Sequence, residues 1–263
     1  MQTFSILRSL ALALKTDLIK YFKYTLLDKI INKLIWASSM LIISTYILPQ
    51  LGIQSSYGAF IAAGIIVSVA FWDAWGVSVQ FVSDLDNNKI IQYYATLPYP
   101  ASLFFVKQIL FYTIRSMIPA LVILPTAKLI LLDHLDLSHL NILYFISIFI
   151  VANVFCATLS LLMTSLVNSM NSIDNISIRF LFPMWFFGGS QFSWQTFHAV
   201  SPIFSYISLC NPLLYAMEAT RASVLGTEGY LPFWSCIVVL TVFSMLFAYI
   251  GSRRLMQRLD CIR

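Results

Sequence analysis

The feature that most constrains this chain is a series of apolar stretches, each long enough to cross a lipid bilayer. About 20 apolar residues in a helix cover the roughly 30 Å of hydrocarbon in a membrane. Of the 263 residues, 59% are hydrophobic and 10% are charged, whereas a soluble domain carries about 25% charged residues. A soluble fold of this size has no interior that could hold so much apolar surface. The sequence therefore predicts one all-α transmembrane domain over residues 1–263.

Six stretches have the length and composition of membrane spans. They cover residues 31–48, 57–82, 103–125, 141–167, 176–192 and 231–252. Lys and Arg mark the cytoplasmic side of a membrane protein. They gather before the first span, beside the loop between the second and third spans, and after the last, while the other side receives Lys128 and Arg221. We expect a multi-pass protein of the cell (inner) membrane with both termini in the cytoplasm, and an even number of spans agrees with this by placing both termini on one side.

Residues 2–28 have the pattern of an amphipathic helix. Apolar residues recur there at steps of three and four, while Arg8, Lys15, Lys20 and Lys23 occupy other faces. A basic helix of this kind lies in the plane of the membrane interface. The alternative is an ordinary surface helix, for which this chain offers no soluble body. The net charge of +5 is therefore assigned to orientation and anionic lipid, and no nucleic-acid partner is expected.

The segment 192–229 is apolar, but Pro202, Asn211 and Pro212 interrupt it. It is too long for a turn and too broken for one clean span. Non-helical backbone at membrane depth must be buried in protein or line a wet cavity. We therefore expect a broken, partly re-entrant pair of short helices on the outer side. The alternative is an external loop that carries an amphipathic helix.

Two charged residues, Asp73 and Arg115, lie inside predicted spans. Asp73 precedes Asp84 by eleven residues, which places it about 16 Å along the second helix, and Arg115 lies at a similar depth in the third. Isolated charges at that depth are costly, and they usually pair or face water. Because the two helices are consecutive and antiparallel, a structural ion pair is the preferred interpretation. Contact with a substrate or a proton is the alternative.

Motifs that carry chemistry are missing from the sequence. It has no G-x-x-x-x-G-K-[ST] loop for nucleotide phosphates, no G-x-S-x-G and no H-E-x-x-H. The run that starts at Asp84 resembles a calcium loop, but Lys89 stands where that loop needs Gly and Ala95 where it needs Glu. We therefore expect no catalytic residues, no metal and no cofactor bound by this chain.

Residues 84–100 resemble the cytoplasmic loop of the type-2 ATP-binding-cassette (ABC) exporter permeases. That loop has a charged stretch and then a short helix, which ends in a threonine–apolar–proline turn before the third span. Here Thr96, Leu97 and Pro98 supply the turn. The acidic opening is thinner than in the family, with Asp84 and Asp86 alone.

A second resemblance to the same family covers the end of the predicted fifth span and the segment before the sixth. Phe182-Pro183 is followed by Phe187-Gly188-Gly189-Ser190, and Pro202 is followed by an NP–Y–E–R pattern. The residues of that pattern are Asn211, Pro212, Tyr215, Glu218 and Arg221. With the amphipathic start and the six spans, the resemblance covers nearly the whole chain.

The resemblance implies a permease that forms half of a dimeric export pathway, with ATP bound and hydrolysed by a separate cytoplasmic ATPase. The second half would be another copy or a homologue. The loop helix would lie in a groove of the ATPase. Its coupling residues would be Lys89, Ile90, Ile91, Tyr94, Leu97 and Pro98.

Other classes of function stay open at this stage. A membrane-embedded enzyme for lipid-linked substrates would need clustered Asp, Glu or His at one interface, and here these residues are scattered. A scaffold protein without transport is a third class. For a permease, the abundance of aromatic residues and the lack of a charge-lined path favour an amphiphilic or lipid-linked substrate.

Overall fold

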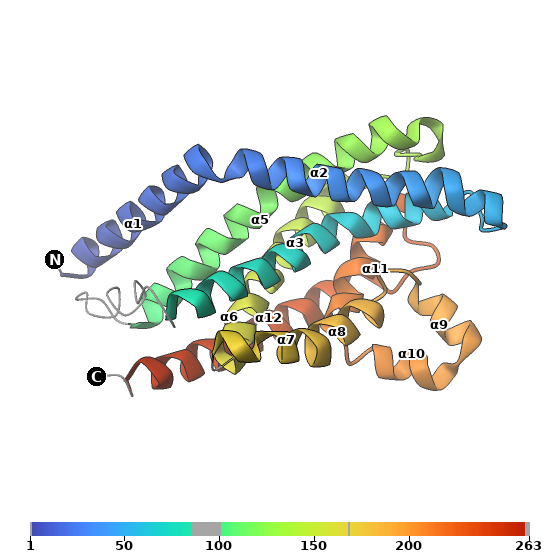
Figure 1. Cartoon of the computed structure of the whole chain (residues 1–263). Helices are drawn as coiled ribbons and strands as arrows, with labels where there is room; N and C mark the ends of the chain where they lie inside the picture. Colours follow the sequence, from blue (N-terminus) through green and yellow to red (C-terminus); the bar gives the residue numbers. More distant parts are fainter. Residues whose placement is uncertain (1, 86–100, 168, 261–263) are drawn as a thin grey trace.

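A computed structural model describes residues 2–85, 101–167 and 169–260, and the secondary structure of this part of the chain is helical (Figure 1). Five of its helices are long and apolar enough to cross a membrane. They cover Leu26–Leu51, Tyr57–Ser83, Leu103–His134, Ile142–Leu166 and Phe233–Arg258. The prediction of an all-α membrane protein is confirmed. The coupling residues, between Lys89 and Pro98, lie outside the described residues.

The elements follow one another in a simple order. The helices are α1 Gln2–Tyr24, α2 Leu26–Ile42, α3 Tyr57–Ser83, α5 Ala101–Leu131, α6 Ile142–Leu166, α7 Ile173–Ile176, α8 Phe182–Phe186, α9 Trp194–Val200, α10 Pro202–Ser208, α11 Pro212–Leu225 and α12 Phe233–Asp260. Shorter turns join them. The π-helical turn η1 Ile43–Ile47 and the 3-10 turn η2 Leu48–Leu51 continue α2, and the 3-10 turn η4 Leu132–His134 follows α5. The 3-10 turn η5 Met170–Ser172 and the π-helical turn η6 Ser177–Leu181 flank α7.

The predicted fifth span is not among the five long helices. Helical turns run from Met170 to Phe186 through η5, α7, η6 and α8, which is short of the roughly 20 residues that a span needs. The residues from Phe187 to Phe192, which the prediction counted within the span, form a turn instead. Two glycines, a serine and a glutamine lie between the two phenylalanines. The six-span count is not confirmed, and the described part of the chain holds five candidates.

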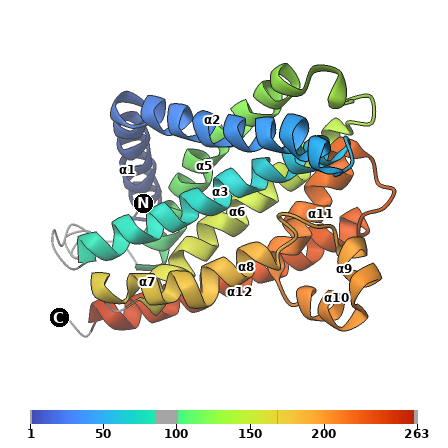
Figure 2. The ribbon, with the colours of Figure 1, turned by 45° about the vertical axis from the view of Figure 1, so that its right-hand side comes forward.

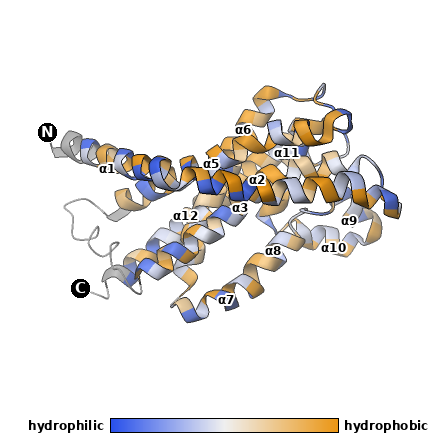
Figure 3. Cartoon of the chain, turned by 45° about the horizontal axis from the view of Figure 1, so that its top comes forward, coloured by the Kyte–Doolittle hydropathy of each residue, from blue (hydrophilic) through white to orange (hydrophobic). Residues whose placement is uncertain are grey.

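Different helices form the two ends of the bundle. The start of α1, the end of α3, the start of α5 and the end of α12 lie at one end, and α9 and α10 lie at the other (Figure 1). Two long helices, α3 and α6, run through the middle, between α2 on one side and α8 and α12 on the other (Figure 2). Apolar residues predominate along the long helices, whereas α1 and the last turns of α12 alternate between polar and apolar residues (Figure 3).

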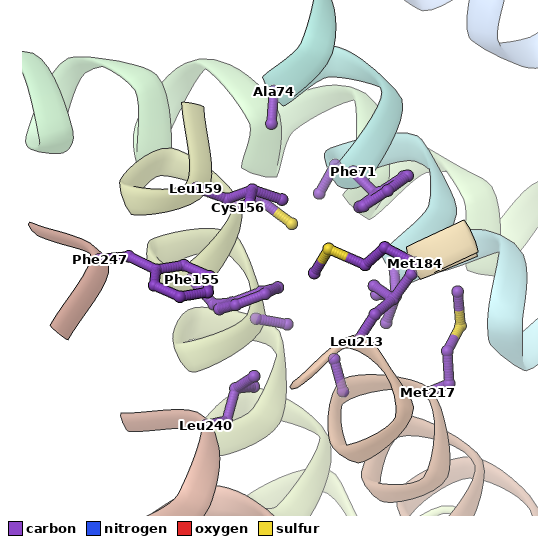
Figure 4. Packing of buried hydrophobic residues seen from close by; sticks show 14 of the residues in the cluster. Phe71, Ala74, Phe155, Cys156, Leu159, Met184, Leu213, Met217, Leu240 and Phe247 are labelled. Carbon is purple, nitrogen blue, oxygen red and sulfur yellow. The ribbon is translucent and has the colours of Figure 1, made fainter. Parts of the chain in front are cut away.

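The largest apolar core fills the space between α3, α6, α8, α11 and α12. Phe71, Phe155, Met184, Leu213 and Leu240 meet there (Figure 4). Apolar burial stabilises a soluble protein by about 25 cal/mol per Å², but lipid tails are themselves apolar. Close van der Waals packing is therefore what holds such a core together in a membrane.

Backbone approaches backbone where α6 passes α12. A methyl group placed on Gly251 would lie 2.9 Å from the backbone nitrogen of Leu162 and 3.0 Å from the carbonyl carbon of Leu161. No side chain fits at that distance, so glycine is required for the two helices to pack so closely. Small residues serve the same purpose wherever membrane helices pack closely.

The predicted amphipathic segment 2–28 is helical, as α1 and the start of α2, which meet at a bend around Thr25. One face of α1 packs against α5. The ring of Tyr21, which is 4% exposed, meets the edge of the Phe111 ring, and Asp17 forms a salt bridge with Lys107. Protein therefore covers this face, while the placement of α1 in the membrane interface remains a prediction.

Candidate functional site

The first polar cluster lies between α2, α3 and α5, and we call Lys29, Asp73, Gln80 and Arg115 the ion-pair cluster. The structure brings together the two charges that lie inside the spans. Arg115 Nε is 3.3 Å from Asp73 Oδ2, and each residue is 5% exposed. At that burial the carboxylate and the guanidinium offset much of each other's desolvation cost.

A second cation, Lys29, contacts the same carboxylate. Its Nζ atom lies 3.6 Å from Asp73 Oδ1, and Arg115 Nη1 donates a hydrogen bond of 3.0 Å to Gln80 Oε1. The sequence analysis missed Lys29 because it placed the residue before the first span. The helix begins earlier, at Leu26, which brings Lys29 opposite α3. The cluster therefore has two cations for one carboxylate.

The amphipathic helix also contacts this region. The Tyr21 hydroxyl donates a 3.2 Å hydrogen bond to the carbonyl oxygen of Arg115, and the guanidinium carbon of Arg115 lies 5.5 Å from the centre of the Tyr21 ring. Together with the Asp17–Lys107 salt bridge, these contacts fix α1 against α5. The position of α1 is thus set by polar side chains that lie close to the ion-pair cluster.

Replacing Asp73 with asparagine is expected to destabilise the fold by about 3 kcal/mol, since Arg115 and Lys29 lose their shared carboxylate. The yield of monodisperse protein in detergent and the midpoint of thermal unfolding would report this. Asp133→Asn, at an exposed aspartate, is the matched control and should change neither. The double variant Asp73→Asn with Arg115→Gln should recover part of the loss. If the single losses simply add, the two side chains are not coupled.

The second polar cluster surrounds α11, and we call Asn211, Tyr215, Glu218 and Arg221 the motif cluster. Glu218 and Arg221 are both 0% exposed. Arg221 Nη1 donates to the carbonyl oxygen of Gly189 at 2.6 Å, and Nη2 donates to that of Ser190 at 3.2 Å. These bonds attach α11 to the turn that follows α8.

Arg221 also contacts α3. Its Nε atom donates to the carbonyl oxygen of Phe60 at 3.3 Å, and its guanidinium carbon lies 3.5 Å from the centre of the Phe60 ring. A methyl group placed on Gly64 would come within 2.9 Å of Arg221 Nη2, so glycine at that position leaves room for the guanidinium. One buried arginine therefore joins three segments that are distant in the sequence.

Glu218 holds the segments before α9 and α12. It lies 3.9 Å from Arg221 Nη1. Its Oε1 atom accepts a hydrogen bond from the backbone N–H of Trp194 at 3.1 Å, and Oε2 accepts one from Leu231 at 3.3 Å. Both carboxylate oxygens are engaged, which is what a buried charge requires.

The start of α11 explains the remaining motif residues. Pro212 lies in the first turn, where a missing N–H costs nothing, and Asn211 Oδ1 accepts from the backbone N–H of Leu213 at 3.1 Å. Asn211 Nδ2 donates to the Met184 carbonyl at 2.7 Å, and the Tyr215 hydroxyl donates to the Leu209 carbonyl at 2.8 Å. The motif residues therefore organise the segment 192–229. Its re-entrant placement in the membrane stays a prediction.

Catalytic or metal chemistry has no visible basis in either cluster. Within the described ranges, no group of three or more His, Cys, Asp or Glu side chains is placed to hold a metal ion. The carboxylates of Asp73 and Glu218 are each engaged by cations or N–H groups. Both clusters connect helices that are distant in the sequence.

Comparison with known proteins identifies the family. Residues 10–225 match the family model described as ABC-2 type transporter, a range that runs from α1 to the end of α11 and includes both clusters. The curated proteins include no match. Because the family match covers most of the chain, this protein belongs to the ABC-2 type transporter family and is the membrane-spanning permease component of an ABC transporter.

Proposed function

We propose that the chain forms half of the translocation pathway of an ATP-driven exporter and works with a separate cytoplasmic ATPase. The observation that carries this proposal is the family match over residues 10–225. The sequence has no nucleotide-binding loop, so ATP binding and hydrolysis belong to the partner. The coupling residues between Lys89 and Pro98 would transmit the movement. We assign both termini and this segment to the cytoplasm of the cell (inner) membrane, because Lys and Arg gather on that side.

A dimer is favoured by the tight packing between α3, α5 and α6 in the middle of one copy. The space beside Asp73, Tyr112 and Cys156 measures about 10 Å³, which is too small for an amphiphile. A pathway would then lie between two copies, or between this chain and a homologue. Exposed apolar side chains are available for it on α2 and around α8. They include Ile35, Ile42, Ile43, Ile47, Phe182, Phe186 and Phe187.

The substrate class follows from the same surface. These side chains are aliphatic and aromatic, which suits an amphiphilic or lipid-linked compound better than a small ion. A membrane-embedded enzyme acting on lipid-linked substrates is not favoured, because the two buried carboxylates, Asp73 and Glu218, are occupied by structural partners.

The test is co-purification of the full-length chain with an ATPase expressed from the same genome. We expect an ATPase with a nucleotide-binding loop to co-purify, and its ATP hydrolysis to depend on the presence of this chain. A variant of that ATPase without its catalytic carboxylate should bind equally and hydrolyse nothing. If the chain purifies without any ATPase and by itself converts a lipid-linked compound, the permease proposal is wrong.

A further inference from the structure

A cavity of about 550 Å³ lies between α1, α3 and α5, at the end of the bundle that we assign to the cytoplasm. Three cations line it, Lys20, Lys107 and Arg115, together with two carboxylates, Asp17 and Asp84. The salt bridge between Asp17 and Lys107 neutralises one charge of each sign. Arg115 is also paired with Asp73, which Lys29 contacts as well. With these two residues included, four cations stand against three carboxylates, and the excess of one positive charge favours an anion.

Two of these cations, Lys20 and Arg115, can still donate hydrogen bonds to an anion. Lys20 is exposed and has no ion-pair partner within residues 2–85, 101–167 and 169–260. Arg115 is buried, and its Nη2 atom has no hydrogen-bond partner among the described residues. A buried guanidinium N–H without an acceptor is costly, so an acceptor oxygen at this position would be stabilising. Arg115 Nη1 already donates to Gln80, while Nε lies 3.3 Å from Asp73 Oδ2 in an ion pair that is not a hydrogen bond.

Aromatic side chains make up much of the rest of the lining, beside the polar Thr25, Gln80 and Gln108. Tyr21, Tyr24, Phe111 and Tyr112 contribute to its walls, and Tyr24 is 70% exposed. Leu110, on the same helix as Phe111, is also largely exposed. A site with cations inside and apolar side chains around it suits a molecule that has an anionic head and an apolar tail.

We infer that this cavity binds the phosphate group of an anionic phospholipid, with Lys20 at its mouth and Arg115 on its buried wall. Guanidinium and ammonium groups donate strong charge-assisted hydrogen bonds to phosphate oxygens. The bound lipid would lie against α1 and would hold this helix on α5 in addition to the Asp17–Lys107 salt bridge. The inference concerns binding alone and does not depend on transport or on an ATPase partner.

The test uses native mass spectrometry of the full-length chain in neutral detergent, with phosphatidylglycerol as the probe. Arg115→Gln could fail to fold, since it leaves Asp73 with Lys29 alone, so the decisive variant is Lys20→Glu. We expect it to lower the fraction of protein that retains phosphatidylglycerol by about tenfold, because one cationic donor is replaced by a repelling charge. Without added phosphatidylglycerol, elution volume and thermal midpoint should stay unchanged, since Lys20 is exposed.

Lys15→Glu is the matched control, because Lys15 is an exposed lysine of α1 that is not part of the lining. The two variants have the same net charge, so a general attraction of α1 to anionic lipid would weaken equally in both. Equal losses would overturn the inference, and so would full retention by Lys20→Glu. Inorganic phosphate distinguishes the source of the anion. Displacement of the lipid by millimolar inorganic phosphate would show a site for a free anion and overturn the lipid assignment.

Discussion

Replacing Arg221 with leucine is expected to destabilise the fold by about 3–5 kcal/mol, enough to prevent accumulation of monodisperse protein. Arg221 is 0% exposed and donates to the carbonyls of Phe60, Gly189 and Ser190. Leucine leaves these carbonyls without a donor and Glu218 without its cation. Lysine at this position keeps the charge but lacks the planar guanidinium group with its several N–H donors. Folding of Arg221→Lys should therefore be impaired as well. Yield by size-exclusion chromatography and the thermal midpoint would measure both effects.

The matched control is Arg254→Leu, which makes the same chemical change at an exposed arginine of α12. It should accumulate like the parent chain. Adding Glu218→Gln to Arg221→Leu should recover part of the loss, because the unpaired carboxylate is removed while an amide oxygen can still accept from Trp194. Normal accumulation of Arg221→Leu would show that the motif cluster does not determine the structure of the segment 192–229.

Changing both Tyr94 and Leu97 to aspartate is expected to abolish association with the ATPase and all ATP-dependent transport, while insertion into the membrane stays normal. The sequence pattern places these residues on one apolar stripe with Ile90 and Ile91. An apolar stripe on a cytoplasmic loop is expected to be buried against another surface. The family resemblance implies that this surface is a groove of the ATPase. Two charges in that groove would have to be desolvated without partners. Co-purification and vesicle transport assays would measure the loss.

The control for this pair is Asn88→Asp with Gln92→Asp. Both residues fall on the opposite side of the same predicted helix, so two negative charges are added without touching the stripe. ATPase binding should be reduced far less than in the first pair. If Tyr94→Asp with Leu97→Asp binds its ATPase and transports at the parent rate, the coupling assignment is wrong. Equal losses in both pairs would point to a general effect of charge.

The long helices could be predicted because each depends on a local property of the sequence. A span requires about 20 apolar residues, and five of the predicted stretches lie in helices that meet this requirement. The stretch at 176–192 has the same composition, but its helix stops at Phe186. Hydropathy reports how apolar a segment is and does not report where its helical turns end. Here the Met184 carbonyl, close to that end, accepts a hydrogen bond from Asn211 at the start of α11.

Contacts in the candidate site could be predicted only where the order and direction of the helices place two residues at the same depth. Asp73 and Arg115 lie at equal depth on consecutive antiparallel helices, so their contact could be anticipated. The salt bridge between Asp17 and Lys107 joins α1 to α5, and no pattern in either helix indicates it. The same holds for the partners of Arg221, which are mostly backbone carbonyls. Any residue type can supply a carbonyl, so sequence alone gives no signal for them.

The close approach of α6 and α12 at Gly251 limits how the chain can change shape during the transport that we propose. Two helices whose backbones touch cannot slide past each other without a steric clash, so they should move as one rigid body. In contrast, polar side chains hold α2 to its neighbours at both ends. Lys29 contacts Asp73, and the Tyr46 hydroxyl donates to the Ile130 carbonyl. Such contacts can exchange partners over a few ångströms, and we therefore expect the relative motion to fall between α2 and the α6–α12 pair.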